Sequence, residues 1–550
     1  MKIDCINLAG PLGKALHTSV NARLKTVDYR LLVDPFRYRN EGDNAWRCEF
    51  WGKIVRSAIL SNVYVQDPEL TQTIRDTVQD ILSTQTPDGC ISSYPAEKQL
   101  QGWDIWGRKY VLLGLVRYYE MIFPDPAVKT ACIRLLDHLI SQVGGDGRKM
   151  KTYGWHDGLA ASSICDAVVG VYRISGEKRF LQFAKEIIAG GASLKHNVFD
   201  AAAAGTAPEN IGNGKAYELT SCFQGLAELC ILGELPDFRY VCRKYYEAIR
   251  DQEIFITGVG GGKDEHGEYW CSGALEQTAP RPGSALGETC VTATWLHYCD
   301  CILRLTGDPS VADQTEIALY NGVLGAMTQN GSNWLHRNPT PLTGGGRKIS
   351  ADDQIGRGFG TPFGGNDCCR AQGPEALAFA PVFAAQAKED GVALNFYEDM
   401  TLEFSGGKLA VSGGYPYQGK VQIRMETGAE TALYLRTPSF LKKVILNGES
   451  LEFGTGSLAI RRKWDPSDDL QLEFDLACRQ VPAPGNRPFA AYMRGPIVLA
   501  EDARGEVPAA VIEKTAGHIL CDYAAAGMPA DEGHPLQVWF PVNNKKMNQF

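Results

Sequence analysis

Two adjacent cysteines, Cys368 and Cys369, stand in the segment Gly-Gly-Asn-Asp-Cys-Cys-Arg, and Glu288 and Cys290 stand far upstream in Gly-Glu-Thr-Cys. Three thiols and one carboxylate are enough to close a soft metal site of the kind that zinc favours. A zinc-bound thiolate is also a potential nucleophile, whereas four protein ligands without water normally indicate a structural site. The residue types therefore predict a metal centre and leave catalysis and structure both open as its role.

Both pairs are expected where a loop ends and a helix begins. Glu288 opens the helix-like run Glu-Thr-Cys-Val-Thr-Ala-Thr-Trp-Leu, which follows the Gly-rich loop 251–286. Side chains two residues apart in a helix diverge by about 200°, so Glu288 and Cys290 can share a metal only at an irregular helix start. The cysteine pair closes the loop 328–372, before a helix that we expect to begin near Pro374.

Composition describes a soluble globular protein of more than one domain. The 550 residues exceed what one hydrophobic core usually supports, and 44% of them are apolar and 22% charged. A net charge of −9 and a pI near 5.6 argue against a nucleic-acid or anionic-membrane partner. We find no run of about 18 apolar residues for a membrane helix and no secretory signal at the start of the sequence.

The sixteen cysteines are not spaced like a disulfide framework. Most of them stand singly in apolar helical stretches, where a free thiol behaves as a small hydrophobic group. Together with the absence of a secretory signal, this usage predicts a reducing, cytoplasmic location.

A turn signal of Asp or Ser with Pro or Glu recurs roughly every 50 to 70 residues, flanked by apolar positions at helical spacing. Its copies are 66–68, 124–126, 175–177, 235–237 and 307–309. Roughly eleven or twelve helices follow, close to six hairpins, with long Gly- and aromatic-rich loops between hairpins, and such loops are usually functional. We therefore predict an (α/α)6 barrel over residues 1–388 with one functional face. The loops are 84–102, 143–155, 190–214, 251–286 and 328–372.

After about Asp390 the pattern changes to alternating apolar and polar residues with short turns, as in Val421-Gln-Ile423-Arg-Met425. Turn signals every 8 to 12 residues are typical of a β-sandwich, which we predict over residues 389–550. The tail after Glu501 is expected only to pack against the rest of the chain.

The order and spacing of four motifs resemble the β-L-arabinofuranosidase family, glycoside hydrolase family 127. The motifs are Glu288-Thr-Cys290, the segment 316–324 (Glu-Ile-Ala-Leu-Tyr-Asn-Gly-Val-Leu), Asn338-Pro339 and Cys368-Cys369. The resemblance spans most of the chain. It implies an (α/α)6 catalytic barrel, a β-sandwich, and hydrolysis with retention of anomeric configuration.

The resemblance also implies roles for the metal-site residues. Cys368 would be the nucleophile that attacks the anomeric carbon, and a zinc ion held by Glu288, Cys290, Cys368 and Cys369 would keep its thiol deprotonated. A separate glutamic acid must then protonate the leaving oxygen and later activate water.

Two residues compete for that acid/base role. Glu268, in Gly267-Glu268-Tyr269-Trp270, resembles the family's Gly-rich acid/base segment but lies farther from Glu288 than the family pattern expects, whereas Glu276 lies nearer. We favour Glu268 and keep Glu276 as the alternative. Glu316 resembles a family residue that faces the substrate.

The sugar-recognising residues depart from the family pattern. His336 stands where a tyrosine is more usual, and Lys109, Ala161 and the segment Ala216-Tyr217-Glu218 stand where the family places histidines. Arg370 follows the cysteine pair in place of the usual proline, so a carboxylated sugar is an alternative to L-arabinofuranose. Further candidates for substrate contact share a position at a loop end: Trp103, Asp104, His156 and Glu218.

The sequence thus predicts a zinc-dependent, retaining exo-glycosidase for a β-L-arabinofuranoside-like or related small-sugar linkage. Two alternatives are a non-catalytic carbohydrate-binding protein with a structural zinc site, and an epimerase or lyase on the same toroid. The expected partner is a small carbohydrate or oligosaccharide, with no nucleic acid and no membrane, and a homodimer is the assembly that we consider.

Overall fold

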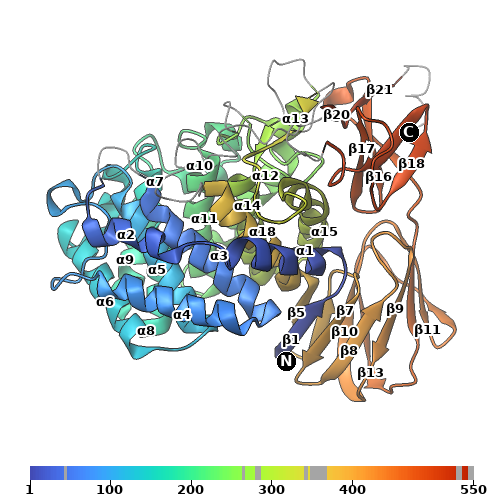
Figure 1. The fold of residues 1–550 in the computed structure, drawn as a ribbon, viewed down its shortest axis with the longest axis horizontal. Helices are drawn as coiled ribbons and strands as arrows, with labels where there is room; N and C mark the ends of the chain where they lie inside the picture. Colours follow the sequence, from blue (N-terminus) through green and yellow to red (C-terminus); the bar gives the residue numbers. More distant parts are fainter. Residues whose placement is uncertain are drawn as a thin grey trace.

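The computed structural model describes residues 1–41, 46–262, 267–278, 286–339, 345–346, 368–527 and 535–542. The N-terminal region is helix-rich and the C-terminal region is β-rich, and Figure 1 shows the two side by side. The α-helices of the described residues are α1 (Pro11–Ser19), α2 (Tyr29–Tyr38), α3 (Phe50–Val65), α4 (Pro68–Ser83), α5 (Asp104–Met121), α6 (Pro126–Gln142), α7 (Leu159–Ser162), α8 (Cys165–Ser175), α9 (Lys178–Ala189), α10 (Val198–Ala203), α11 (Ala216–Ile231), α12 (Arg239–Gln252), α13 (Gly273–Glu276), α14 (Thr289–Thr306), α15 (Ser310–Ile317), α16 (Leu324–Ala326) and α18 (Cys368–Ala384).

The predicted hairpin turns are confirmed, and their caps explain why each helix begins where it does. After α3, Gln66 adopts a left-handed conformation, and Asp67 then caps α4 by accepting a hydrogen bond from the Leu70 amide at 2.9 Å. Proline occupies the first position of α4, where its missing N–H costs nothing. Asp125 caps α6 in the same way, before Pro126.

Six helices pack in a closed ring, in which α3 contacts α5, and the contacts continue through α8, α11, α14 and α18 back to α3. The helices α4, α6, α9 and α12 pack against this ring, and each buries only one stripe of residues. In contrast, almost every residue of α11 is buried. Gly52 lets α3 and α5 meet closely, because a Cβ there would lie 2.1 Å from the Tyr110 carbonyl oxygen.

The β-rich region begins with two sheets, drawn at the lower right of Figure 1. The seven-stranded sheet has the order β1-β7-β8-β9-β14-β11-β12, and the four-stranded sheet has the order β13-β10-β6-β5. Their strands are β1 (Ile3–Leu8), β5 (Ala385–Ala387), β6 (Gly391–Leu394), β7 (Met400–Phe404), β8 (Gly407–Ser412), β9 (Lys420–Met425), β10 (Ala429–Thr437), β11 (Leu441–Leu446), β12 (Glu449–Leu451), β13 (Gly456–Trp464) and β14 (Leu470–Phe474).

The first strand of the chain belongs to the second region. Strand β1 pairs antiparallel with β7, with Ile6 opposite Leu402. A division of the chain at residue 388 would therefore separate β1 from its sheet. It would also separate β5, which pairs with β6. For the rest of the chain, the division into 1–388 and 389–550 stays a prediction.

The tail does more than pack against the body. From Arg479 onward the chain forms a third sheet, drawn at the upper right of Figure 1, with its own buried apolar cluster. Its strands are β15 (Arg479–Pro482), β16 (Phe489–Arg494), β17 (Ile497–Asp502), β18 (Ile512–Thr515), β19 (His518–Asp522), β20 (Pro535–Gln537) and β21 (Phe540–Pro541), and β4 (Gly345–Gly346) of the first region pairs with β20. The expectation for the tail was wrong. Its strands are short and are stabilised by pairing with one another, so no single strand has a strong signal in the sequence.

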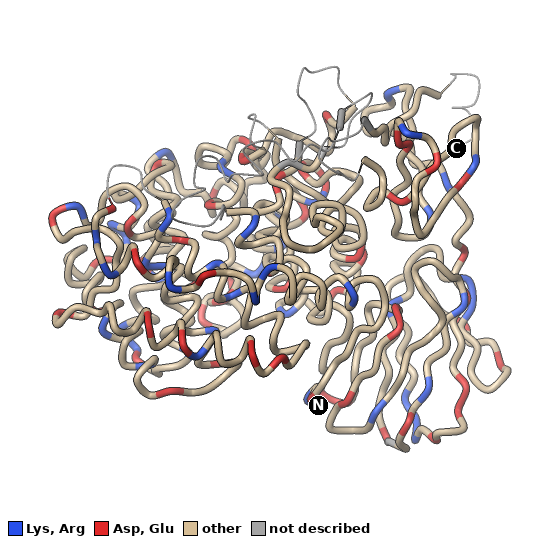
Figure 2. Tube along the Cα trace, viewed as in Figure 1, with Lys and Arg blue, Asp and Glu red and all other residues tan. Residues whose placement is uncertain are grey.

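Charged residues of both signs are interspersed over both regions, as Figure 2 shows. Among the described residues, no helix is long and apolar enough to cross a membrane. All sixteen cysteines are free thiols, as the spacing predicted.

Candidate active site and metal centre

A short strand pair brings Glu288 beside His336. Strand β2 (Leu286–Glu288) pairs antiparallel with β3 (Arg337–Pro339), so Glu288 lies opposite Arg337. The ladder continues into α14, where the Thr289 amide donates to the His336 carbonyl oxygen at 3.2 Å. The Nε2 atom of His336 then lies 3.7 Å from the Glu288 carboxylate.

The three thiols reach Glu288 from the starts of two helices. Glu288 is extended and Cys290 is the second residue of α14, which is the irregular helix start that the sequence required. Cys368 and Cys369 begin α18, six residues before Pro374, so the helix starts earlier than expected and includes that proline. The four side chains of Glu288, Cys290, Cys368 and Cys369 converge, with one donor atom of each within 4.8 Å of the others.

The spacing of these donor atoms fits a tetrahedral metal. The Sγ atoms of Cys368 and Cys369 lie 3.9 Å apart, and they lie 3.8 and 3.7 Å from the Glu288 Oε1 atom. A zinc ion with Zn–S near 2.3 Å has tetrahedral edges of about 3.8 Å between sulfurs and about 3.6 Å between sulfur and oxygen. The residues present can therefore hold such an ion with little movement.

Burial works against several charges in this cluster at once. Burial raises the pKa of Cys290, of Cys369 and of Glu288 well above their ordinary values, and the neighbouring Glu268 raises that of Glu288 further. Hydrogen bonds from Cys290 and Cys369 hold the pKa of Cys368 well below its ordinary value. A divalent cation that binds here would have to displace the protons of these buried groups.

A small pocket of about 190 Å³ opens over this cluster. It lies where α3, α5, α11, α14 and α18 begin, which agrees with the predicted functional face. Cys368 lines the pocket and is half-buried, whereas Cys369 is buried behind it. The described lining residues are Trp46, Glu49, Lys53, Trp103, Trp106, Lys215, Tyr217, Glu218, Glu268, Glu288, Cys290, His336 and Cys368.

Glu268 faces the pocket from the loop before α13, and the start of α11 holds it there. The Ala216 amide donates to the Glu268 carbonyl oxygen at 3.0 Å, and the Lys215 ammonium forms an ion pair with the Glu268 carboxylate. Carboxylate oxygens of Glu268 and Glu288 and a ring nitrogen of His336 lie within 4.8 Å of one another. Burial opposes the charge of Lys215, but Glu218, Glu268 and Glu288 together raise its pKa.

Two further predicted residues, Glu218 and Trp103, also line the pocket. The Oε2 atom of Glu218 is buried without a hydrogen-bond partner among the described residues, so it can accept a hydrogen bond from a ligand. His156 lies behind this wall: its ring lies 5.5 Å from that of Trp103, and its Nε2 atom is 3.9 Å from Glu218. Burial lowers the pKa of His156.

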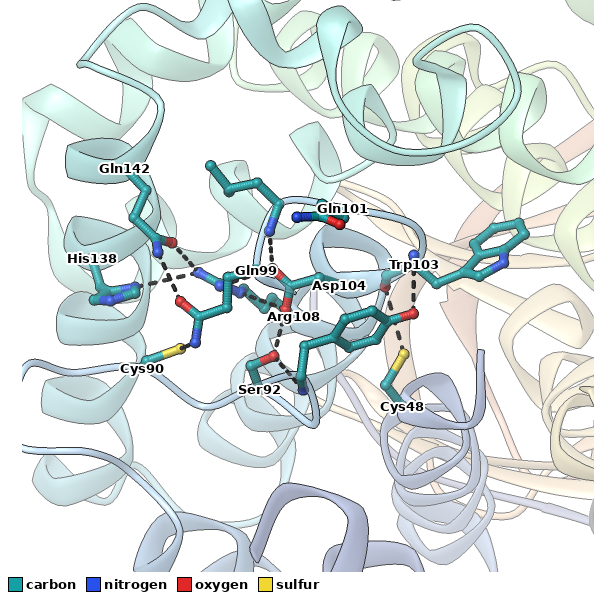
Figure 3. A network of polar contacts seen from close by, with 12 residues as sticks. Cys48, Cys90, Ser92, Gln99, Gln101, Trp103, Asp104, Arg108, His138 and Gln142 are labelled. Carbon is teal, nitrogen blue, oxygen red and sulfur yellow. Dashed lines mark hydrogen bonds and ion pairs between the residues drawn. The ribbon is translucent and has the colours of Figure 1, made fainter. Parts of the chain in front are cut away.

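Asp104 was expected to contact substrate, but the structure places it in a buried network, shown in Figure 3. Its carboxylate accepts hydrogen bonds from Ser92 and from the Leu100 amide, and it forms an ion pair with Arg108 at 2.8 Å. The network fixes the loop that presents Trp103 to the pocket. The expectation failed because Asp104 starts α5 with its side chain directed toward the preceding loop.

Glu276 and Glu316 are not among the described residues that line the pocket. Glu276 pairs with Arg487 at 3.1 Å, so the structure favours Glu268 over Glu276 near the thiols. Glu316 is buried between the two regions, where it forms an ion pair with Arg436 at 2.7 Å and accepts a hydrogen bond from the Tyr415 hydroxyl at 2.9 Å. Arg436, Tyr415 and Arg487 all lie in the β-rich region. Glu276 and Glu316 therefore join the two regions.

The cations suggested for a carboxylated sugar also lie outside the described lining. Lys109 is buried behind Trp106, with its ammonium 4.2 Å from the ring centroid and 3.1 Å from the Ser163 hydroxyl. Burial lowers the pKa of Lys109 to about 7. Arg370 is buried in α18, and its carbonyl oxygen accepts a hydrogen bond from Arg23 at 3.3 Å.

Sequence reasoning missed several lining residues. Glu49 and Lys53 lie at the junction of the short helix Arg47–Glu49 with α3, and Lys215 lies immediately before α11. Glu-x-x-x-Lys usually reads as a solvent-exposed helix pair, so its burial here has no signal in the sequence. The position of Lys215 at the end of the long loop 190–214 was an available signal.

The chain was compared with known proteins. A family model described as "Beta-L-arabinofuranosidase, GH127 catalytic domain" matches residues 14–381. The chain belongs to the GH127 family. This GH127 protein is therefore a glycoside hydrolase, and its substrate is a carbohydrate.

Relatives of this GH127 protein agree over most of its length. A non-reducing end β-L-arabinofuranosidase of Bifidobacterium longum subsp. longum is 21% identical over 82% of this chain and 74% of its own. The crystal structure of a GH127 β-L-arabinofuranosidase from Geobacillus stearothermophilus T6 shares the fold, with a TM-score of 0.74, 17% identity, and coverage of 98% of this chain and 100% of that chain. A second structure, described as a GH127 β-arabinofuranosidase, has a TM-score of 0.74 and 17% identity over 99% of this chain and 98% of that chain.

Proposed function

We propose that this protein is a retaining exo-glycosidase that removes a single β-L-arabinofuranose or closely related pentose, with Cys368 as its nucleophile. The observation that carries the proposal is the placement of one accessible thiol, Cys368, in a cluster of four metal donors at the floor of a small pocket. The volume of about 190 Å³ is below the range of about 300 to 1,000 Å³ usual for drug-sized ligands, which suits one sugar ring. The names of the relatives support the choice of pentose.

Zinc is the proposed metal, held by Glu288, Cys290, Cys368 and Cys369. The donor set of three thiols and one carboxylate, with edges close to those of a tetrahedron, supports this choice. When bound, zinc would keep these thiols deprotonated at neutral pH. The Nδ1 atom of His336, 3.5 Å from the Cys369 Sγ atom, would hold that sulfur in place from behind.

In the first half of the proposed reaction, the Cys368 Sγ atom attacks the anomeric carbon. A carbon–sulfur bond forms as the glycosidic carbon–oxygen bond breaks, and Glu268 gives its proton to the leaving oxygen. Both groups lie close to Glu288, Cys368 at 3.8 Å and Glu268 within 4.8 Å, so one bound sugar can contact both. The ion pair between Lys215 and Glu268 must open for the acid role, and the nearby Glu218 carboxylate can receive the ammonium.

In the second half, a water molecule replaces the leaving group. The Glu268 carboxylate takes a proton from this water, the water oxygen bonds to the anomeric carbon, and the carbon–sulfur bond breaks to restore the Cys368 thiolate. Two displacements at one carbon leave the anomeric configuration as it began.

The ring of six helices supports an (α/α)6 barrel for the catalytic region, and the two packed sheets support a β-sandwich beside it. The cytoplasmic location and the homodimer stay predictions from the sequence.

The proposal is tested by hydrolysis of aryl β-L-arabinofuranoside and a panel of other aryl pentosides, with the first product followed by proton NMR. We expect release of one pentose, with the β-anomer appearing before mutarotation. Appearance of the α-anomer first would exclude retention. A zinc-loaded protein that binds the pentosides but hydrolyses none of them would instead indicate a carbohydrate-binding protein with a structural metal.

A further inference from the structure

A buried ion pair forms one wall of the pocket and has no role in the reaction above. The Lys53 ammonium lies 2.9 Å from the Glu49 carboxylate, and only 3% and 5% of these side chains are exposed. The Trp106 indole N–H donates to the second oxygen of Glu49. Both charged residues line the pocket beside Cys368.

Aromatic rings also lie close to the ammonium. The Lys53 nitrogen lies 4.7 Å from the ring centroid of Tyr217, 5.1 Å from that of Tyr110 and 5.8 Å from that of Trp106. Cation–π attraction holds the ammonium in position without using its protons in hydrogen bonds. The Lys53 nitrogen therefore has a fixed position at the wall of the pocket.

The hydrogen-bonding capacity of the pair is only partly used. An ammonium group has three donors, and the contacts of Lys53 among the described residues include one hydrogen-bonding partner, Glu49. A buried charge whose hydrogen bonds are incomplete is destabilising, and a ligand oxygen that completes them recovers part of that cost. Each Glu49 oxygen also keeps a lone pair for a hydroxyl donor.

We propose that Glu49 and Lys53 together determine specificity by recognising two neighbouring oxygens of the sugar. Lys53 donates to one sugar oxygen while Glu49 accepts from the adjacent hydroxyl, a combination that matches a vicinal diol. Neither residue of the pair forms or breaks a bond in the proposed reaction. This inference rests on the proposed function, because it names what the same pocket recognises.

The charges of the pocket select a neutral sugar over an acidic one. Its described lining includes the four carboxylates of Glu49, Glu218, Glu268 and Glu288 but only the two ammonium groups of Lys53 and Lys215. Each lysine is already paired, with Glu49 and with Glu268. A carboxylate on the sugar would therefore face excess negative charge without a free cation among these residues.

The test measures kcat/KM of the zinc-loaded enzyme and its variants on an aryl pentofuranoside and on its 2-deoxy, 3-deoxy and 5-deoxy analogues. Hydrogen bonds to charged groups contribute about 1.5–3 kcal/mol each, so we expect the wild type to discriminate against the relevant deoxy analogue by about 10- to 100-fold. In Glu49→Gln and Lys53→Met this discrimination should fall below about 5-fold, with the loss mainly in KM. The double variant E49Q/K53M leaves no uncompensated buried charge, so it guards against a folding defect.

The control is Lys185→Met, which removes a surface ion pair with Glu234 and should leave every ratio unchanged. Unchanged discrimination in E49Q, K53M and the double variant, in an enzyme that hydrolyses the parent sugar, would overturn the inference and leave the proposed function standing. An equal fall of kcat on all four sugars, with zinc lost, would overturn it too, because Lys53 would then act on the thiols.

Preference of the wild type for a sugar oxidised to a carboxylate at C5 would contradict the charge argument. Failure of the wild type on every pentoside would refute the proposed function instead.

Discussion

Replacing Lys109 by methionine should stabilise the protein, and should do so more at pH 7 than at pH 9. The Lys109 ammonium is 1% exposed and lies over the Trp106 ring, with the Ser163 hydroxyl as its hydrogen-bond partner. Burial lowers its pKa from 10.5 to about 7. Methionine fills a similar volume and needs no hydrogen bond.

The sign and size follow from proton binding. Between pH 7 and 10.5 the unfolded chain keeps the Lys109 proton that the folded chain releases, so this residue lowers stability progressively as the pH falls through that range. Each pKa unit is about 1.36 kcal/mol, so the cost grows by about 2 kcal/mol between pH 9 and pH 7 and levels off below pH 7. The gain from Lys109→Met should therefore be larger at pH 7 by about 2 kcal/mol.

Differential scanning calorimetry of both proteins at the two pH values measures this gain. With an unfolding entropy of about 2.1 cal/mol/K per residue, about 2 kcal/mol corresponds to a shift of about 2 °C in Tm for a region of this size. Comparing variant with wild type at each pH cancels the titration of all other groups, and Lys185→Met serves as a surface control. An advantage of Lys109→Met that is the same at pH 7 and pH 9 would refute the assignment of a depressed lysine pKa at this position.

Three further predictions concern the site and its support. Glu268→Gln should lower kcat/KM about 10²- to 10⁴-fold on substrates with poor leaving groups and much less on activated aryl glycosides. Glu276→Gln, which weakens the pair with Arg487, should change neither, and the reverse order would make Glu276 the acid/base. Glu316→Gln should destabilise the protein by about 3–5 kcal/mol, measured as a lower Tm, because Arg436 stays buried without the negative charge of Glu316. A raised KM with unchanged Tm would instead place Glu316 at the substrate. Chelation should lower both Tm and activity, and one equivalent of zinc per chain should restore both; full activity in metal-free protein would rule out the metal centre.

The sequence predicts the metal cluster well because its residue types are rare and their places are distinctive. Cys368 and Cys369 are adjacent, and Glu288 with Cys290 can converge only at a helix start, which is where both pairs lie. The helical hairpins were equally predictable, since caps such as Asp67 are local signals. These features need no knowledge of distant contacts.

Where the structure departs from the expectation, each difference depends on a partner far along the chain. Glu316 and Glu276 are suitable carboxylates by type, but Arg436 and Arg487 of the β-rich region occupy them. Strand β1 pairs with β7 some 400 residues later, so the domain boundary drawn from local pattern missed it. In the same way, Glu49 and Lys53 form an ordinary helix pair until the ring of helices buries them beside the thiols.

The central claim is that Cys368 attacks the sugar, and intact-mass analysis after trapping tests it most directly. A cyclophellitol- or haloacetamide-type pentofuranose probe should add one mass increment to the wild-type chain, and peptide mapping should locate it at Cys368. The variant Cys368→Ser should take up no label while Glu288, Cys290 and Cys369 still retain zinc. Labelling that persists undiminished in Cys368→Ser would contradict the account.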